Sequence, residues 1–510
     1  MVFKVSEDKK FLVLVDSTEL ELKQLEYSFT KKVNNWYIIK KKKPDMTWDG
    51  EVQFIDRYNR IPIGLWKEVQ KLAKQYHFPL EIEGIEHLYD KNFDVNHFNM
   101  WLDEHFRNSD KKPRDYQAEA SSQLLKFRFC TEEISTSGGK TLIAYTFFRY
   151  LYQHDKIKKM LYIVPNVSLV TQSEEEFYEY EDGCGFRPKW KTDCAFGGRK
   201  DTEANTNIIF GTFQTLAKKD LEYFKDFDAV IVDETHHAKA KSIKDIIVKC
   251  YNAKYRIGLT GTLPKDGTCD SFTIQAYLGP QVYNLESAKL ISDGHATPVL
   301  VYGVELDYLS DEVKKKLYDL RNVPAEQKDG AKLLNLEKDI ARDSRERFNY
   351  IVDTISKVKK NSLVLFSDVK NDYGRRIYDW LRANTTKKAY YIDGGTKSEN
   401  RDYYKSQMED EKDVIIVASV GTFSEGINIH NLHNIFVVES YKSQFIIRQI
   451  LGRGMRLLDG KEKIIVIDFS DDFCYGSGWH KTNYLMKHAN EREKIYKEKK
   501  FPFKKFKVKL

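Results

Sequence analysis

The chain has few cysteines and no long apolar run, and these absences narrow its class. Its 510 residues include 6 cysteines, and no two of them stand in CxxC spacing, which disfavours a zinc site. A disulfide between Cys184 and Cys194 stays open, although reduced thiols of a cytoplasmic protein are the simpler interpretation. No apolar stretch approaches the roughly 20 residues of a membrane span, and the apolar run at 11–15 is too short for a signal peptide. We therefore expect a cytoplasmic protein without a membrane partner.

The chain also has little excess charge of one sign. Lys and Arg number 83 against 76 Asp and Glu, a net charge of +7, which permits a nucleic-acid partner without requiring one. The excess is concentrated in two places. Residues 40–43 are four consecutive lysines, and residues 491–510 hold eight Lys and one Arg against three Glu. We expect residues 491–510 to form a basic tail.

Short runs rich in Val and Ile recur in two series, each interrupted by longer segments of helical pattern. The expected strands are 160–164, 207–210, 229–232 and 256–259, then 362–366, 389–392, 414–418, 435–438 and 464–467. This alternation is typical of parallel sheets covered by helices on both faces. It predicts two α/β domains, residues 96–290 and 291–490. Residues 1–95, with strand-like runs at 11–15, 36–39 and 51–55, predict a small α+β domain.

A glycine-containing loop is the first candidate site. Residues 135–141 read Ser-Thr-Ser-Gly-Gly-Lys-Thr, and the two glycines allow successive backbone N–H groups to face a phosphate. Lys140 would reach the β- and γ-phosphates of ATP, and Thr141 would place its hydroxyl on Mg²⁺. Because Ile134 stands where the usual pattern has its first glycine, an ordinary turn before Lys-Thr stays open. The predicted nucleotide-binding residues of this loop are Ser135, Thr136, Ser137, Gly138, Gly139, Lys140 and Thr141.

A pair of acids is the second candidate site. Asp233 and Glu234 end the apolar run 229–232, and ligands of open α/β sheets bind where strands end. Asp233 suits the magnesium shell, and Glu234 suits a base for the attacking water. The alternative is a solvated surface pair. His236 and His237 follow, but no third ligand at metal spacing accompanies them.

Two arginines near the C-terminus are the third candidate. Arg453 and Arg456 lie three apart on an expected helix and therefore share a face. Phosphoryl transfer gains greatly from an arginine at the γ-phosphate. Ordinary ion pairing is the alternative, although Gly452 and Gly454 are costly in a helix kept only for solubility.

Taken in order, these motifs resemble those of superfamily 2 helicases. Residues 135–141, 233–236, 260–262 and 449–456 are similar to motifs I, II, III and VI. Further segments match the Q motif at 113–117, motif Ia at 163–166, Ib at 211–215, IV at 364–366 and V at 424–428. Motif II reads Asp-Glu-Thr-His, which argues against the RNA-specialised DEAD-box branch.

The resemblance implies two RecA-like domains with ATP and Mg²⁺ between them. It implies catalytic roles for Lys140, Asp233, Glu234, Gln449, Arg453 and Arg456, magnesium contacts for Thr141 and Asp233, and nucleotide contacts for Gln117 and Gly426. It also implies contacts to the nucleic-acid backbone by Pro165, Asn166, Gly211, Thr212, Gln214 and Thr215.

The first 95 residues narrow the resemblance to one group of superfamily 2 helicases. Residues 48–50 and 58–65 are similar to the N-terminal domain of phage UvsW-type helicases, which remodel branched DNA. That similarity implies a DNA contact by Trp48, and the basic run at 40–43 adds a contact by Lys41. The alternative is that Trp48 and Tyr58 are aromatic residues of the domain's core.

The expected function is therefore an ATP-dependent DNA helicase of superfamily 2. It would act in phage replication, recombination and repair by fork regression, branch migration and unwinding of RNA–DNA hybrids, in the host cytoplasm. A double-strand translocase that does not separate strands, and a nucleotide-gated DNA-binding or annealing factor, are the alternatives.

Overall fold

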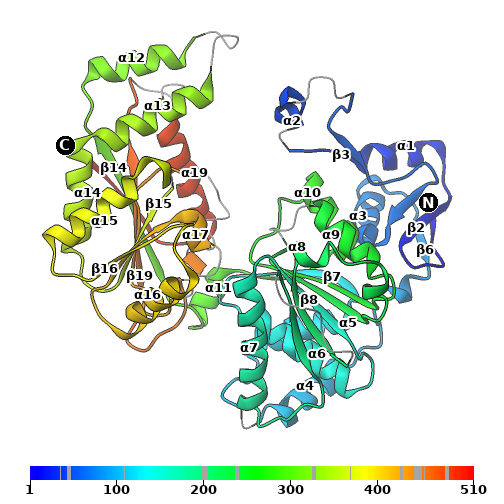
Figure 1. Ribbon diagram of the computed structural model, residues 1–510. Coiled ribbons are helices and arrows are strands. Elements are labelled where there is room, and N and C mark those ends of the chain that lie inside the picture. The colour runs from blue at the N-terminus through cyan, green and yellow to red at the C-terminus, as the bar shows by residue number, and fades with distance from the viewer. Residues whose placement is uncertain are drawn as a thin grey trace. The chain divides into compact units, whose positions relative to one another are not determined.

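The computed structural model describes residues 1–510 except 35, 43–46, 108, 198–204, 236–239, 324–328, 368, 425–428, 442–450, 453 and 477–481. The chain divides into two compact units, Met1–Leu285 and Glu286–Leu510 (Figure 1). Each unit contains a seven-stranded sheet whose neighbouring strands all run parallel, with helices on both faces. The predicted fold class, two RecA-like sheets in tandem after a small α+β region, is confirmed.

The first unit begins with the α+β region. Its elements are β1 (Val2–Val5), β2 (Phe11–Asp16), α1 (Glu19–Ser28), β3 (Thr30–Lys32), α2 (Trp36–Lys42), β4 (Glu51–Gln53), β5 (Arg60–Pro62), α3 (Trp66–Tyr76) and β6 (Glu81–Glu83). The mixed sheet has the order β5-β2-β1-β6, and β3 pairs with β4. The strand expected at 36–39 is wrong, because these residues begin helix α2. The helix stacks Lys40 over the ring of Trp36, with Nζ 5.6 Å from the ring centre, a contact at the i, i+4 spacing of one helix face.

The large sheet of the first unit has the order β13-β7-β12-β11-β8-β10-β9. Its strands are β7 (Phe129–Ile134), β8 (Met160–Val164), β9 (Thr192–Ala195), β10 (Ile208–Thr212), β11 (Ala229–Asp233), β12 (Tyr255–Thr260) and β13 (Gln281–Leu285). Its helices are α4 (Val95–His105), α5 (Asp115–Lys126), α6 (Lys140–Gln153), α7 (Val167–Gly183), α8 (Phe213–Leu216), α9 (Ala240–Lys249) and α10 (Cys269–Leu278). The four expected strands of this series are confirmed within two residues.

Strand β7 was not expected, because it contains two consecutive acids. Glu132 is nevertheless fully buried, and among the described residues neither of its carboxylate oxygens has a hydrogen-bond partner. Burial raises the pKa of Glu132 well above its ordinary value, and the charge of Glu119 raises it further. Burial inside the sheet therefore favours the neutral, protonated form of this side chain.

The α+β region and the first large sheet share one hydrophobic core. Phe272 on α10 contacts Phe29, with ring centres 5.6 Å apart, and Phe54, at 5.4 Å. A Cβ on Gly64 would lie 1.9 Å from the carbonyl oxygen of Gln275, also on α10, so only glycine permits this approach. Removing residues 1–95 would consequently expose the apolar face of α10.

The second sheet has the order β16-β17-β15-β18-β19-β14-β20. Its strands are β14 (Val299–Asp307), β15 (Ser362–Phe366), β16 (Ala389–Ile392), β17 (Ile415–Ser419), β18 (Asn434–Val437), β19 (Ile464–Asp471) and β20 (Phe503–Lys509). The helices are α11 (Ser287–Ser292), α12 (Asp311–Arg321), α13 (Gly330–Asp343), α14 (Arg345–Lys357), α15 (Tyr373–Asn384), α16 (Ser398–Asp410), α17 (Val420–Ser424) and α19 (Tyr484–Glu498). All five expected strands of this series are present.

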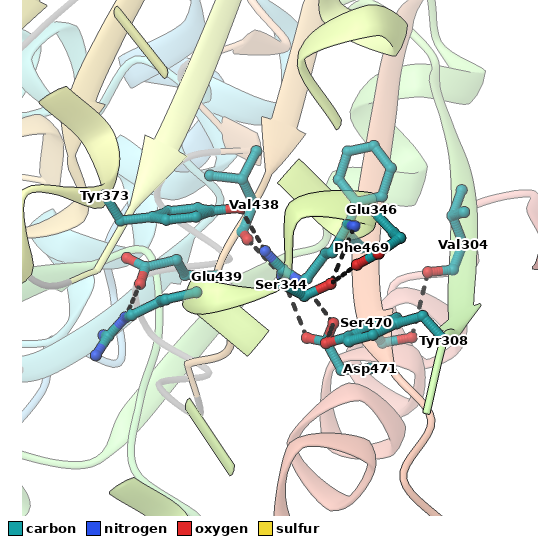
Figure 2. A network of polar contacts seen from close by, with 12 residues as sticks. Val304, Tyr308, Ser344, Glu346, Tyr373, Val438, Glu439, Phe469, Ser470 and Asp471 are labelled. Carbon is teal, nitrogen blue, oxygen red and sulfur yellow. Dashed lines mark hydrogen bonds and ion pairs between the residues drawn. The ribbon is translucent and has the colours of Figure 1, made fainter. Parts of the chain in front are cut away.

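A buried polar network fixes helix α14 to this sheet (Figure 2). The guanidinium of Arg347 on α14 donates to Asp471 at the end of β19, with Nε–Oδ1 at 2.5 Å, and to the carbonyl of Val438 after β18 at 2.8 Å. The hydroxyl of Tyr308 donates to the same Asp471 carboxylate at 2.9 Å. Because Asp471 neutralises Arg347, the pair can be fully buried without an unpaired charge.

The last twenty residues, for which the charge pattern predicts a basic tail, are folded. They form the end of α19 and the edge strand β20, which pairs in parallel with β14. Lys505 bridges Glu305 and Glu493 at 2.9 and 2.8 Å, so part of the positive charge is neutralised within the unit.

All six cysteines are free thiols. Cys130, Cys194, Cys250 and Cys269 are buried, whereas Cys184 in the first unit and Cys474 in the second are half-buried. The disulfide between Cys184 and Cys194 that the sequence left open is not formed.

No helix in the described part of the chain is long and apolar enough to span a bilayer.

Candidate nucleotide site and nucleic-acid edge

The loop after β7 turns sharply into α6. Ser137 and Gly139 have left-handed backbones, with φ of 75° and 76°, and the N–H of Gly138 donates to the carbonyl of Ser135 at 2.8 Å. Helix α6 then begins at Lys140, so its N-terminus lies at the carboxyl end of the sheet. A helix N-terminus behind a glycine turn provides the free N–H groups that bind phosphate. The predicted nucleotide-binding residues at 135–141 are thus brought together on one turn.

Gln117 holds this loop from α5. Its amide Nε2 donates to the carbonyl of Gly138 at 3.0 Å, and its Oε1 accepts the N–H of Arg114 at 2.9 Å. A Cβ on Gly139 would lie 2.2 Å from the same Nε2, so the contact requires glycine. The Gln117 side chain is therefore engaged with the phosphate loop, and its predicted contact to the nucleotide stays a prediction.

Lys140 and Glu234 form an ion pair at the sheet edge. Nζ lies 3.0 Å from Oε1, and the side chains are only 10% and 14% exposed. Glu234 has a left-handed backbone, with φ of 50°, because the chain turns immediately after β11. Lys140, which is predicted to bind phosphate, is thus paired directly with Glu234, which is predicted to act on the attacking water.

Asp233 is buried beside this pair. Its carboxylate accepts the hydroxyl of Tyr162 at 3.0 Å and the N–H of Glu234 at 2.8 Å. Burial raises the pKa of Asp233 to about 6, with Lys140 opposing the shift and Glu234 adding to it. Because burial disfavours the charge of the Asp233 carboxylate, a cation bound beside it would stabilise the ionised form.

The segment after β12 completes this edge. Thr260 ends β12, and its hydroxyl accepts the N–H of Thr262 at 3.2 Å. A Cβ on Gly261 would lie 3.4 Å from the hydroxyl of Thr136, so this turn touches the phosphate loop. Since β7, β12 and β11 are neighbours in the sheet, the segments resembling motifs I, III and II end side by side.

The arrangement fits a nucleotide with Mg²⁺. The glycine turn leaves no room for a side chain on Gly139, and the available oxygens are the Thr141 hydroxyl and the Asp233 carboxylate. In the described part of the chain no group of three or more His, Cys, Asp or Glu could hold a metal by itself. This small donor set suits Mg²⁺, which keeps several waters and binds phosphate oxygens.

The residues predicted to contact nucleic acid lie at the ends of two other neighbouring strands. Pro165 and Asn166 follow β8, and Asn166 caps α7 by accepting the N–H of Leu169 at 3.0 Å. After β10, Thr212 caps the short helix α8. The amide of Gln214 donates to the carbonyl of Pro165 at 3.5 Å and links the two segments. Gly211 and Thr215 belong to the second segment, so all six predicted positions share one sheet edge.

In the second unit, Arg456 is the predicted site residue that the structure describes. Its carbonyl accepts the hydroxyl of Thr297 at 2.9 Å and the ammonium of Lys461 at 3.2 Å. Lys461 also donates to the carbonyls of Gly454 at 2.7 Å and His430 at 2.8 Å, and burial lowers its pKa to about 8. Sequence reasoning missed this lysine, although a cation just after a helix end is a known C-terminal capping signal. Gln449, Arg453 and Gly426 lie outside the described residues.

The N-terminal residues predicted to contact DNA have different surroundings, and their DNA contacts stay predictions. Trp48 is half-buried, and its Nε1 donates to the carbonyl of Glu51 at 2.7 Å. Tyr58 is 58% exposed, which excludes a core role, and the guanidinium carbons of Arg57 and Arg60 lie 4.8 and 5.0 Å from its ring centre. Lys41 belongs to α2, but its side chain lies outside the described part.

Two family profiles match the chain. The profile described as "Type III restriction enzyme, res subunit" matches residues 110–265, and the profile "Helicase conserved C-terminal domain" matches residues 346–457. Together they span the segments that resemble helicase motifs.

Individual relatives extend the similarity to the N-terminal region. The ATP-dependent DNA helicase UvsW of Enterobacteria phage T4 is 30% identical over 476 residues, which cover 89% of each chain. The DNA 3'-5' translocase XPB2 of Sulfurisphaera tokodaii is 27% identical and covers 69% of this chain and 80% of its own. The crystal structure of T4 UvsW aligns over 100% of both chains at 25% identity with a TM-score of 0.50. This chain belongs to the UvsW family of superfamily 2 helicases.

Proposed function

We propose that the protein is an ATP-dependent DNA helicase that remodels branched DNA. One observation carries the ATP-dependent part: a glycine phosphate loop, a lysine–glutamate pair at 3.0 Å and a buried aspartate meet at one sheet edge. The similarity to UvsW over nearly the whole chain, including the N-terminal region, supports DNA as the nucleic acid on which the enzyme acts.

Each residue of the nucleotide site has a proposed task. Backbone N–H groups of residues 137–141 and the Lys140 ammonium bind the phosphates. Thr141 and Asp233 hold Mg²⁺, which neutralises charge on the transferring phosphoryl group when bound. Glu234 orients the attacking water and accepts its proton. Because Lys140 is paired with Glu234 in the structure, binding of the phosphates requires the lysine to exchange one anionic partner for another.

The second unit contributes to the same reaction in this proposal. Arg453 and Arg456 meet charge that develops on the γ-phosphate, Gln449 acts with them in catalysis, and Gly426 contacts the nucleotide. The carbonyl contacts of Lys461 and Thr297 hold the backbone at Arg456 in place.

The proposed DNA contacts divide into backbone and branch contacts. Segments 165–166 and 211–215 hold the strand by its phosphates, so binding is salt-dependent and largely indifferent to sequence. Trp48, Tyr58 and Lys41 supply stacking and charge at a fork or junction. An RNA–DNA hybrid also offers backbone phosphates and stacked bases, and it is a further proposed substrate.

A double-strand translocase is the second candidate. The relative XPB2 is named a DNA 3'-5' translocase, and this chain covers 80% of its length. Such an enzyme hydrolyses ATP on duplex DNA and moves along it without displacing a strand.

One set of assays distinguishes these functions. ATP turnover, strand displacement and fork regression are measured at one salt concentration on single strands, duplexes, forks and four-way junctions. We expect junction-stimulated turnover and fork regression, both lost in Lys140→Ala. ATP turnover on duplex DNA without displacement or regression would instead identify a translocase. Since residues 1–95 share a core with α10, their role is tested with Trp48→Ala and Tyr58→Ala rather than by truncation. Equal losses on forks and on simple tailed duplexes would contradict a role in branch recognition.

A further inference from the structure

A cavity of about 270 Å³ lies at the amino-terminal edge of the first sheet. It is formed where β7 and β12 begin and where α6 ends, so it is separated from the phosphate loop by the length of these elements. Its walls carry three aromatic residues and three cations: Phe93, Tyr150, Tyr255, Arg128, Lys156 and Lys254.

Arg128 lines this cavity without a direct ion pair to any described residue. Within the described part of the chain, no carboxylate lies within 4.0 Å of its guanidinium, whereas Lys254 pairs with Asp228 at 3.3 Å. Burial raises the pKa of the Tyr255 hydroxyl, Arg128 lowers it and Asp90 raises it, so both charges lie near this hydroxyl. Lys156 is exposed at the rim and adds a further positive charge.

The negative groups around the cavity are already engaged. Asp90 is the one carboxylate among the described lining residues, and its Oδ1 accepts the N–H of Asn92 at 2.9 Å within its own turn. At the end of α6, the carbonyl of Tyr150 accepts Nδ1 of His154 at 2.7 Å, and that of Leu151 accepts the N–H of Lys156 at 2.9 Å. These two carbonyl oxygens are therefore hydrogen-bonded to local donors, which weakens the negative potential that the helix end presents to the cavity.

Size and lining define the ligand. A cavity of about 270 Å³ is below the usual range for drug-sized ligands, about 300–1,000 Å³, and admits a group of roughly one nucleotide but no duplex. Phe93 is half-buried and Leu125 adds an apolar wall, so a planar ring can lie against them while an anion faces Arg128.

We propose that this cavity binds one nucleotide unit, with its base against Phe93 and its phosphate at Arg128, and that single-stranded DNA supplies the unit. The DNA source rests on the proposed function, whereas the nucleotide chemistry rests on the cavity itself. The site is distinct from segments 165–166 and 211–215, which lie at the carboxyl edge of the same sheet. The cavity would give the first unit a second DNA contact, with a part of the strand that lies beyond segments 165–166 and 211–215.

The cavity is connected to the ATP site by three continuous elements. Strand β7 and helix α6 each join it to the phosphate loop, and β12 joins it to Thr260. Helix α6 has 14 residues, a span of about 21 Å. DNA-stimulated ATP turnover is therefore an additional readout of occupancy.

Photo-crosslinking of the full-length protein tests the proposal. The probe is dT12 with one 5-iodo-deoxyuridine, and adducts are mapped by mass spectrometry in the presence and absence of excess dTMP. We expect an adduct on Phe93, Tyr150 or Tyr255 that unlabelled dT12 competes away. Adducts confined to other segments would overturn the proposal. Equilibrium binding of dTMP without any adduct from dT12 at this cavity would retain the nucleotide site and overturn the strand as its source.

Binding measurements on variants give an independent outcome. Arg128→Gln should weaken dT12 binding about fivefold and reduce the slope of log affinity against log salt by about 0.7. Lys189→Gln removes an exposed charge from the same unit and serves as the matched control, and Lys156→Gln replaces Arg128→Gln if that variant does not fold. ATP turnover without DNA should stay unchanged in all three. Equal affinities of Arg128→Gln and the control would contradict the site, whereas a wild type that neither binds dT12 nor unwinds forks would contradict the proposed function instead.

Discussion

Replacing Glu234 by glutamine should block ATP hydrolysis and at the same time tighten ATP binding. In the structure, Glu234 holds the Lys140 ammonium at 3.0 Å. Phosphate must compete with that carboxylate for the lysine. Glutamine keeps the shape of the side chain but removes both the competing charge and its repulsion of the phosphates.

The structure sets the size of the effect. Two charges 3.0 Å apart interact by at most about 5 kcal/mol at an effective dielectric constant of 20, before desolvation is subtracted. The net value of a charge-assisted hydrogen bond is about 1.5–3 kcal/mol. Releasing Lys140 from this pair should therefore tighten ATP binding about ten- to a hundredfold.

Equilibrium binding of a fluorescent ATP analogue and steady-state turnover measure the two effects separately. Glu234→Asp is the matched control, because it keeps the charge while withdrawing the carboxylate by one methylene. We expect Glu234→Gln to bind tightly without turning over, and Glu234→Asp to lose turnover with a smaller gain in affinity. Unchanged or weaker ATP binding by Glu234→Gln would refute the idea that this ion pair opposes nucleotide entry.

Three further predictions concern single positions. Glu132→Met should raise the free energy of unfolding by about 1–3 kcal/mol at pH 7, because it removes a buried acid whose oxygens lack partners. Since burial raises the pKa of Glu132, the gain should fall below pH ~4 to the pH-independent cost of the oxygens without partners and grow above that pH, which urea unfolding at several pH values checks. Gly139→Ala should weaken ATP binding at least about tenfold, because its Cβ would meet Gln117 at 2.2 Å. Gly185→Ala has a similar positive φ but open space around it, and should cost only about 1 kcal/mol of stability. Lys461→Met should destabilise the second unit by about 3 kcal/mol and lower ATP turnover more than ATP affinity. In the wild type, the folded pKa of Lys461 is about 8, below the unfolded value of about 10.4. Its contribution to stability should therefore rise between these pH values and be absent from the variant.

The sequence predicts the helicase fold because its strands are short apolar runs that end in motif residues. Met160–Val164 and Ser362–Phe366 are strands with the expected bounds, since each is uniformly apolar or small and buried on both faces. Strand β7 breaks this rule through Glu132, whose burial depends on neighbouring strands that no local pattern shows. The edge strand β20 escapes prediction for the opposite reason. Its lysines suit a solvated tail, and only its pairing with β14 and ion pairs such as Lys505 to Glu305 make it part of the sheet.

In the candidate site, too, the sequence shows local motifs but not the contacts that tertiary packing makes. Spacing identifies the phosphate loop and the acids, because these motifs act through backbone turns at strand ends. It does not identify the Lys140–Glu234 pair, which joins residues 94 positions apart in the chain, or the role of Lys461 beneath Arg456. Contacts of this kind depend on tertiary packing, and no residue pattern within either segment encodes them.

The distribution of thiols gives each unit its own natural attachment point for a dye. Four of the six cysteines are buried, and the two half-buried ones, Cys184 and Cys474, belong to different units. The thiolate is the species that attacks a maleimide, and burial raises the pKa of Cys474 to about 12, so this position should label slowly. A donor fluorophore can thus be added first at Cys184 and an acceptor later at Cys474 at higher pH. Energy transfer between them would report any change in the distance between Cys184 and Cys474 of the unmutated enzyme during turnover, one molecule at a time.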